Sequence, residues 1–304
     1  MMIAASSLFG MTTIIAKILG QGFEGESLHP FQVSSGRFFF ALMTLIIFYS
    51  FNRFKIKSSN LRIHFGRSIL GWLGVSSMFA AVMFIPISDA IAISFMNPVI
   101  AMFVAIPVLK EKVGRTRWLA ASISFAGALI LLRPGLDSFH WAAALAFGAA
   151  LFLGIEVILI KKLSSLESPI QILIINNSIG TVLSLTAASF FWIAPTPRQW
   201  IELAALGVIM VSGQFLFIQS MKSADASFAL PFSYMTLVFG ATYDFFIFST
   251  QPDWISYVGA ATIVSGAILL GTREVLKKIG NKIYVFIISN LLTLTTSLFF
   301  LGSS

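Results

Sequence analysis

Apolar stretches of about 18 to 24 residues, separated by short segments with charges, Pro or Gly, run through most of this chain. Because a helix needs roughly 20 residues to cross a hydrocarbon layer of about 30 Å, each stretch predicts one membrane-spanning helix. The chain is 57% hydrophobic and 11% charged, against about 45–50% apolar and about 25% charged residues in a soluble domain. A β-barrel is not expected, because segments such as 38–51 are apolar on every face instead of alternating.

Ten spans are predicted, which makes the chain an all-α polytopic membrane protein. They cover residues 2–19, 30–50, 67–85, 89–109, 117–132, 141–160, 169–193, 199–221, 225–248 and 254–271. A further apolar run, 283–301, is either an eleventh C-terminal spanning helix or a tail that lies in the interface. The sequence alone does not decide between the two.

The basic residues gather in one set of alternate loops, which predicts the orientation. They are Arg53, Lys55, Lys57, Arg62, Arg67, Lys110, Lys112, Arg115, Arg117, Lys161, Lys162, Lys222, Arg273, Lys277, Lys278 and Lys282. The other loops hold Arg133 and Arg198 among acidic residues. The positive-inside rule therefore predicts a cytoplasmic N-terminus in a bacterial inner membrane, and it explains the net charge of +8 without nucleic-acid binding. No cleavable signal peptide is expected, and the lack of cysteine excludes thiolate chemistry.

An internal repeat is visible as residue pairs at nearly constant offsets. The pairs are Gly71 with Gly207, Ser76 with Ser212, Asp89 with Asp225, Pro30 with Pro169, Gln32 with Gln171, Gly10 with Gly154 and Lys17 with Lys161. With five spans in each copy, the second copy is inverted in the membrane, an organisation typical of secondary transporters. The expected domains are a first repeat over 1–135, an inverted repeat over 139–272, and a basic linker with an apolar tail over 273–304.

The chain resembles the drug/metabolite transporter superfamily, in particular the EamA-type permeases. The resemblance is carried by Ser88-Asp89-Ala90, Asn97-Pro98, the run from Leu109 to Gly114, Arg117-Trp118, the run from Gly127 to Gly135, Pro231-Phe232-Ser233-Tyr234 and Gly259-Ala260-Ala261. Thr250 stands where the family usually has Glu. The resemblance implies a ten-helix bundle with a central cavity lined by spans 1 to 4 and 6 to 9, with spans 5 and 10 outside.

Charged residues inside predicted spans are candidates for function, because a charge near the bilayer centre costs at least about 2.5–3.5 kcal/mol on insertion scales. Arg37 either binds a carboxylate or phosphate of the cargo, or forms a structural salt bridge or reaches the interface. Lys17 and Asp244 lie at the same membrane level as Arg37. They either form an outer gate or a protonatable coupling group, or Asp244 is an interfacial carboxylate that reaches water.

Glu156 in the sixth span also has two interpretations. If it faces the cavity, burial makes it a proton carrier. Alternatively it pairs with Lys161 or Lys162 near the cytoplasmic surface.

Uncharged polar and aromatic residues complete the candidate cavity. Asn97, Asn176, Asn177 and Gln214 are expected to line it or to link neighbouring helices. Trp72, Phe79, Phe215 and Tyr234 are the aromatic candidates for a wall that receives an aromatic or cationic cargo. By contrast, Asp89 and Asp225 are expected to cap helices.

The leading hypothesis is a secondary transporter that moves a small organic metabolite by alternating access. Amino acids, amines and nucleoside-like solutes such as S-adenosylmethionine are the cargoes that the resemblance suggests. A flippase for a lipid-linked head group is the alternative, and an intramembrane enzyme is less favoured because its motifs are missing. No catalytic residue, metal or cofactor is expected. Small-residue faces on the fifth and tenth spans leave open a homodimer through these helices.

Overall fold

The structure is a computed structural model, and it describes residues 1–22, 25–52, 60–82, 84–85, 87–135, 142–249 and 251–273. The side chains of residues 52, 79, 82, 87 and 88 lie outside the description. The predicted linker and the apolar run 283–301 also fall outside it, as does Thr250.

The described chain is helical, with no strand among the described residues, so the all-α fold class is confirmed. The helices are α1 (Met2–Gln21), α2 (Pro30–Asn52), α3 (Leu61–Val82), α4 (Ile87–Ser94), α5 (Asn97–Leu109), α6 (Arg115–Leu132), α7 (Ala143–Leu166), α8 (Pro169–Ala188), η2 (Ser189–Phe191), α9 (Pro197–Ser223), α10 (Ala226–Ala229), η3 (Leu230–Tyr234) and α11 (Met235–Phe248). A last helix, Trp254–Arg273, is named the C-terminal helix below. Within the described ranges, eight helical segments are long and apolar enough to cross a membrane.

The helices run alternately between two ends of the bundle. We call the end where α1 ends and α2 begins the mouth end, and the opposite end, where α2 ends and α3 begins, the base end. The third span was predicted to begin at Arg67, but α3 begins at Leu61. Arg67 is therefore buried inside a helix, and its assignment to a loop was wrong.

The predicted fourth and ninth spans are both interrupted, the first between α4 and α5 and the second at η3. Pro98 and Pro231 stand next to these breaks, where a proline removes a backbone donor. Side chains bond the backbone carbonyls at the breaks: Tyr234 Oη donates to Phe95 O at 2.9 Å, and Ser6 Oγ donates to Phe232 O at 3.2 Å. The two broken helices are thus joined to each other and to α1.

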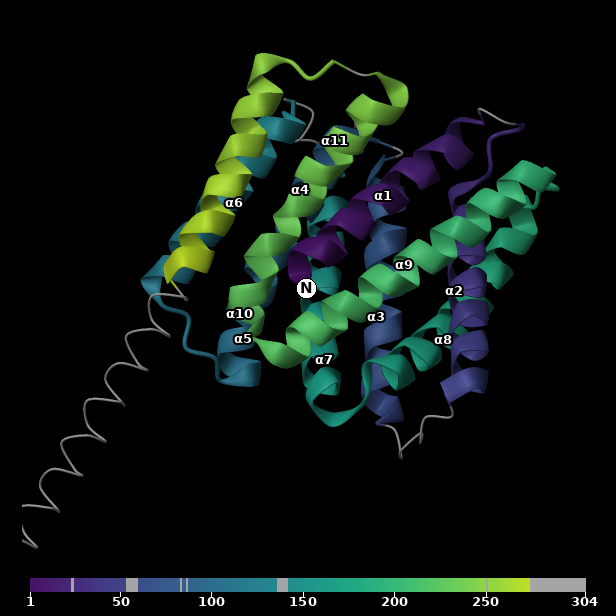
Figure 1. Cartoon of the computed structure of the whole chain (residues 1–304), viewed down its shortest axis with the longest axis horizontal. Coiled ribbons are helices and arrows are strands. Elements are labelled where there is room, and N and C mark those ends of the chain that lie inside the picture. The colour runs from purple at the N-terminus through teal and green to yellow at the C-terminus, as the bar shows by residue number, and fades with distance from the viewer. Residues whose placement is uncertain are drawn as a thin grey trace, which may run out of the picture.

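The helix contacts come in matching pairs across the two predicted repeats. α3 of the first predicted repeat packs along α7 of the second, and α9 of the second packs along α1 of the first. In the same way, α7 packs on α5, and α1 packs on α11. Glycines make two of these approaches close. A Cβ on Gly10 would lie 3.0 Å from Gly240 N, and one on Gly154 would lie 3.1 Å from Asn97 O. α2 packs against α8 and α9 on the other side of the bundle (Figure 1).

α6 and the C-terminal helix lie side by side at one edge of the molecule (Figure 1). Their small residues meet each other: a Cβ on Gly127 would lie 2.7 Å from Ile263 N, and one on Gly266 would lie 2.9 Å from Ala120 O. These are the faces on which the homodimer hypothesis depended. Because they are occupied within one chain, a homodimer through these helices would have to use other residues.

Gly127→Val is expected to destabilise the protein, because the added side chain would force α6 and the C-terminal helix apart. Overpacking of this kind costs about 1–3 kcal/mol, which lowers a melting temperature by roughly 2–8 °C. Thermal unfolding in detergent measures the effect. Gly271→Val is the matched control, because nothing lies within 4 Å of a Cβ at Gly271. Equal melting temperatures for the two variants would contradict the close packing.

Candidate functional site

A cavity of ≈ 190 Å³ lies in the middle of the bundle, between α2, α3, α7, α8 and α9. Its polar wall is made by Arg37, Ser68, Glu156, Asn176 and Gln214. Phe31, Phe38 and Trp72 supply its aromatic wall. Gly71 makes room for the carboxyl group of Glu156, whose Cδ lies 3.1 Å from the position of a Cβ at this glycine. A larger residue at position 71 would therefore displace Glu156.

Two further spaces extend this cavity to the mouth end. A second cavity of ≈ 310 Å³ between α1, α2 and α9 shares Ser34, Arg37 and Val75 with the first. It shares Gly20, Leu28 and Pro30 with a hollow beside His29 and Phe191. The shared residues form one path from Glu156 to the mouth end, and Arg37 stands where the two cavities meet.

Positive charge exceeds negative charge around the inner cavity. Arg67 Nε lies 3.4 Å from Glu156 Oε1, and both side chains are largely buried. Arg37 stacks on Phe38, with its Cζ 4.2 Å from the ring centroid. Arg37 Nε and Gln214 Oε1 are buried and have no hydrogen-bond partner among the described residues. Two guanidinium groups thus face one carboxylate, and unpaired polar atoms remain on the wall.

The alternative in which Glu156 pairs with Lys161 or Lys162 is wrong. Lys161 Nζ instead donates to Ala224 O at 2.6 Å and to Met221 O at 2.5 Å. Glu156 lies more than one turn closer to the mouth end, where Arg67 reaches it. The sequence did not indicate this partner, because Arg67 had been counted as a loop residue.

Four of the predicted lining residues do not line the cavities found in the described part of the chain. Asn97 Nδ2 donates to Ser94 O at 3.0 Å, beside the break before Pro98. Asn177 Nδ2 donates to Leu173 O at 2.8 Å within α8. Tyr234 is buried at the second break, and Phe215 is partly exposed on α9. The side chains of Asn97, Asn177 and Tyr234 therefore donate to backbone carbonyls and do not face these cavities. The side chain of Phe79 lies outside the described residues.

At the mouth end, Lys17 of α1 and Asp244 of α11 form an ion pair, with Nζ 2.5 Å from Oδ1. This pair lies between the two predicted repeats. Arg133 binds Asp253 nearby, and its guanidinium, together with Ser256, holds the pKa of Asp253 well below its usual range. Because the pKa is lowered on folding, the stabilising contribution of Asp253 is present above about pH 4 and is lost only in more acidic solution.

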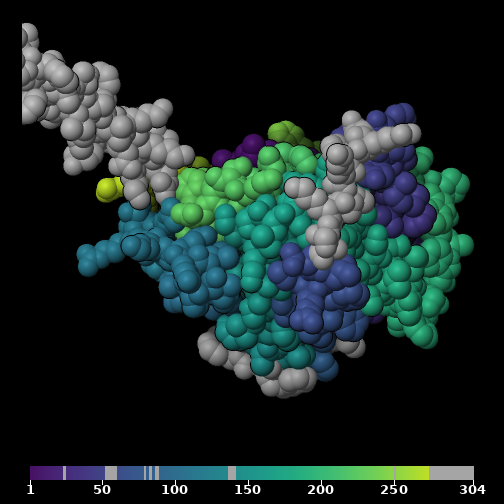
Figure 2. All heavy atoms as spheres, turned by 90° about the horizontal axis from the view of Figure 1, so that it is seen from below, coloured from purple at the N-terminus to yellow at the C-terminus, as the bar shows by residue number. Residues whose placement is uncertain are grey.

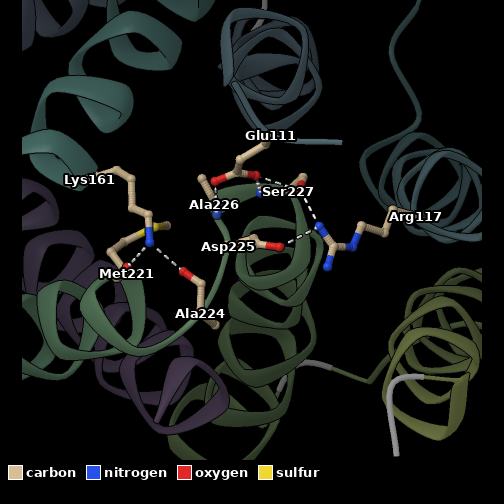
Figure 3. Close-up of polar contacts among 8 residues, drawn as sticks. All are labelled: Glu111, Arg117, Lys161, Met221, Ala224, Asp225, Ala226 and Ser227. Atoms are coloured by element: carbon tan, nitrogen blue, oxygen red, sulfur yellow. Dashed lines mark hydrogen bonds and ion pairs between the residues drawn. The ribbon is translucent and has the colours of Figure 1, made fainter. Parts of the chain in front are cut away.

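At the base end, a polar cluster that sequence reasoning missed joins the α5–α6 region to α10 (Figure 3). Glu111, in the loop after α5, accepts hydrogen bonds from Ala226 N, Ser227 N and Ser227 Oγ at 2.7, 3.0 and 2.6 Å. Arg117 of α6 donates to Asp225 Oδ2 at 2.9 Å and to Ser227 Oγ at 2.7 Å. We call Glu111, Arg117, Asp225 and Ser227 the base clasp. It ties the first predicted repeat to the second.

The base clasp corrects the prediction that Asp225 caps a helix through its side chain. Asp225 does precede α10, but its side chain makes no capping bond and binds Arg117 instead. Glu111 takes the free amides of α10 in its place. Asp89 lies inside the first turn of α4 and accepts a hydrogen bond from Gly135 N at 3.1 Å. Figure 2 shows the contact between the two predicted repeats on this side of the molecule: α5 and α6, in blue, touch α9 and α10, in green, beside α7, in teal.

Apolar helices, two broken helices and a buried polar cavity between two sets of helices define a multi-pass membrane transporter. The chain belongs to the EamA-like transporter family, whose model matches residues 1–133 and again residues 140–272. Small-metabolite secondary transport is the function of this class.

Individual relatives are similar over most of their length. The S-adenosylmethionine uptake transporter of Rickettsia bellii is 30% identical over 81% of this chain and 85% of its own. The riboflavin transporter of Vibrio cholerae is 31% identical over 70% of this chain and 72% of its own. A solved crystal structure superposes with a TM-score of 0.76 over 88% of this chain and 94% of that chain, at 16% identity, which shows the fold alone.

Proposed function

We propose that this chain transports a metabolite that carries an amino-acid group, with S-adenosylmethionine as the first candidate, through the cavity at Arg37. The observation that carries the proposal is the excess of guanidinium over carboxylate around the inner cavity. A buried charge needs a partner, and a planar guanidinium binds a carboxylate through two hydrogen bonds. A carboxylate on the cargo would supply the missing negative charge.

The other groups of such a cargo also find partners on the wall. Glu156 can accept from an ammonium group, in exchange for part of its contact with Arg67. The face of Trp72 suits a sulfonium group or a planar base. The second cavity leaves space for the nucleoside part between Arg37 and the mouth end. Riboflavin has the planar ring but no carboxylate, so it fits this wall less well.

The movement that we propose is alternating access between two inverted repeats, 1–135 and 139–272. The double match of the family model, the paired helix contacts and the two matched breaks support this division. In the structure the cavities reach the mouth end and the base clasp is closed. The ion pair of Lys17 with Asp244, which was expected to form a gate, is already made while the cavities reach the mouth end, so we propose instead that it holds α1 against α11. Opening the base would break the clasp.

The orientation belongs to the same proposal. Basic residues gather at the base end: Arg62 of α3, Lys110 and Lys112 after α5, Arg115 and Arg117 of α6, Lys161 and Lys162 of α7, and Lys222 of α9. The positive-inside rule therefore supports a cytoplasmic base end in a bacterial inner membrane. The mouth end would then face the periplasm.

Counterflow of labelled S-adenosylmethionine into proteoliposomes tests the cargo. We expect competition from unlabelled S-adenosylmethionine, and at least about tenfold weaker competition from its decarboxylated form, because loss of a charged hydrogen-bond partner costs about 1.5–3 kcal/mol. The decarboxylated compound keeps the adenosine, the sulfonium and the amine, so it is a matched control. Equal competition by both compounds would contradict the role of the carboxylate. If riboflavin is transported and S-adenosylmethionine is not, riboflavin replaces S-adenosylmethionine as the proposed cargo. Lipid scrambling without transport of any solute would favour a flippase.

A further inference from the structure

A buried histidine–glutamate pair lies on the α3–α7 seam, between the cavity and the base end. His64 Nε2 lies 2.9 Å from Glu167 Oε2, and the side chains are 0% and 2% exposed. His64 is in the second turn of α3, and Glu167 follows the last residue of α7. The pair therefore joins an element of the first predicted repeat to one of the second.

The partners of Glu167 fix which nitrogen of His64 can exchange a proton. Glu167 Oε1 accepts from Asn60 N at 3.0 Å, and Oε2 accepts from Gln171 Nε2 at 2.8 Å. Since a carboxylate with these donors is an acceptor, His64 Nε2 carries a hydrogen and donates it to Glu167. The remaining nitrogen, Nδ1, is buried and has no partner among the described residues. Nδ1 is thus the ring nitrogen that remains open to a further partner.

A track of unpaired polar atoms leads from Nδ1 to the inner cavity. His64, Arg67, Ser68 and Gly71 recur at helical spacing on one face of α3, and Ser68 and Gly71 line the cavity. Arg67 Nη1 and Ser68 Oγ are buried without a hydrogen-bond partner among the described residues, and Arg67 Nε lies beside Glu156. Buried polar groups in proteins are normally satisfied by protein or ordered water. Water along this face would connect His64 with Glu156.

The corresponding position in the other predicted repeat lies at the mouth end, and it is folded without a histidine–glutamate pair. Gln32, the counterpart of Gln171, makes two bonds to the backbone of Ile193 at 2.6 and 3.1 Å. At the offsets of the internal repeat, Trp200 corresponds to His64 and Leu28 corresponds to Glu167. The histidine and the glutamate occur in one copy only, which points to a task beyond packing.

We infer that His64 is the proton-binding residue that couples transport to a pH gradient, with Glu167 as its fixed partner and the Ser68 face as its path to the cavity. The inference rests on the proposed transport function. An imidazole is suited to the task, because it can take up and release a proton at a ring nitrogen while the other nitrogen stays bonded to its carboxylate partner. A protonated His64 neutralises Glu167 across the repeat boundary. Loss of the proton leaves a buried carboxylate there, so the contact between the repeats changes with protonation.

The helices packed on α3 are α7, α8 and α4, and they differ in the charged or polar groups that they place near His64. α7 contributes Glu167 and, towards the cavity, Glu156, while α3 itself contributes Arg67. α8 contributes the uncharged Gln171. The titratable residue of α4, Asp89, lies near the mouth end, bonded to Gly135. Glu167 is thus the charged group in direct contact with the imidazole.

Two assays on the same proteoliposomes test the inference. One measures counterflow without a pH gradient, and the other measures accumulation under an imposed gradient. One coupled proton allows about tenfold accumulation per pH unit. His64→Gln is expected to keep counterflow within about twofold of wild type and to lose the gradient-driven accumulation, because the cargo contacts are intact while the proton site is gone. Glu167→Gln is expected to weaken the accumulation in the same direction.

Arg62→Gln is the control, because Arg62 is an exposed residue of α3 two positions from His64 and lines neither cavity. It is expected to keep both activities. Wild-type counterflow without any effect of the gradient would overturn the coupling while leaving the proposed function intact. Gradient-driven accumulation retained by a folded His64→Gln variant would overturn the assignment of His64. Absence of counterflow for every cargo would overturn both the coupling and the proposed function.

Discussion

Arg37→Ala is expected to reduce cargo counterflow by about 10- to 150-fold, the loss that corresponds to one charge-assisted hydrogen-bonding partner of about 1.5–3 kcal/mol. Arg37 stands where the inner and outer cavities meet, so cargo on either side of it would contact its guanidinium. Its Nε has no partner among the described residues, so the group is available to a ligand. Uptake into proteoliposomes measures the effect.

Two further variants show whether the effect belongs to cargo binding. Arg37→Lys keeps the charge but loses the planar fork, so we expect it to fall between wild type and alanine. Arg62→Ala removes an exposed arginine from α3 and is expected to leave transport unchanged. Wild-type counterflow in a folded Arg37→Ala variant would remove Arg37 from the cargo site.

Glu111→Ala is expected to open the base end. The substitution leaves the amides of Ala226 and Ser227 without their carboxylate, and each charge-assisted bond contributes about 1.5–3 kcal/mol. We therefore expect the closed base to be disfavoured by about tenfold or more. A cysteine placed at Ser68 in this cysteine-free chain should react faster with an impermeant thiol reagent added from the base side.

Lys112→Ala is the matched control for the base clasp, because it changes an exposed residue of the same loop. It is expected to leave the labelling rate at Ser68→Cys unchanged. If Glu111→Ala also leaves this rate unchanged, the base clasp is not the barrier between the cavity and the base end.

The helical fold could be predicted because lipid permits little else for such long apolar stretches. The position of Arg67 inside α3 could not be predicted, because a positive charge near the end of a span is read as a loop residue until its partner is known. That partner, Glu156, lies on a helix of the other predicted repeat. The breaks at Pro98 and Pro231 had a visible signal, but the bonds that stabilise them come from Ser6 and Tyr234.

For the site, sequence reasoning identified polar and charged residues that are energetically costly to place inside a membrane span. Three of them, Arg37, Glu156 and Gln214, line one cavity. Sequence reasoning failed for Asn97 and Asn177, because an amide in a helix can bond to the backbone of its own helix. It missed Glu111, although the Lys110-Glu111-Lys112 run was noticed, because the α10 amides that donate to this carboxylate are at least 115 residues away in the sequence. His64 was not predicted either, because its partner Glu167 is 103 residues away in the sequence.

The most direct test of the cargo site at Arg37 is protection of one cysteine by cargo. Ser34 lines both cavities and lies one turn before Arg37, so Ser34→Cys places a thiol beside the proposed site. S-adenosylmethionine is expected to slow the labelling of this thiol by an impermeant maleimide from the mouth side, while Ser249→Cys, exposed at the mouth end after α11, keeps its rate. Adding Arg37→Ala should abolish the protection. An unchanged labelling rate at Ser34→Cys with every cargo of the panel would contradict a cargo site at Arg37.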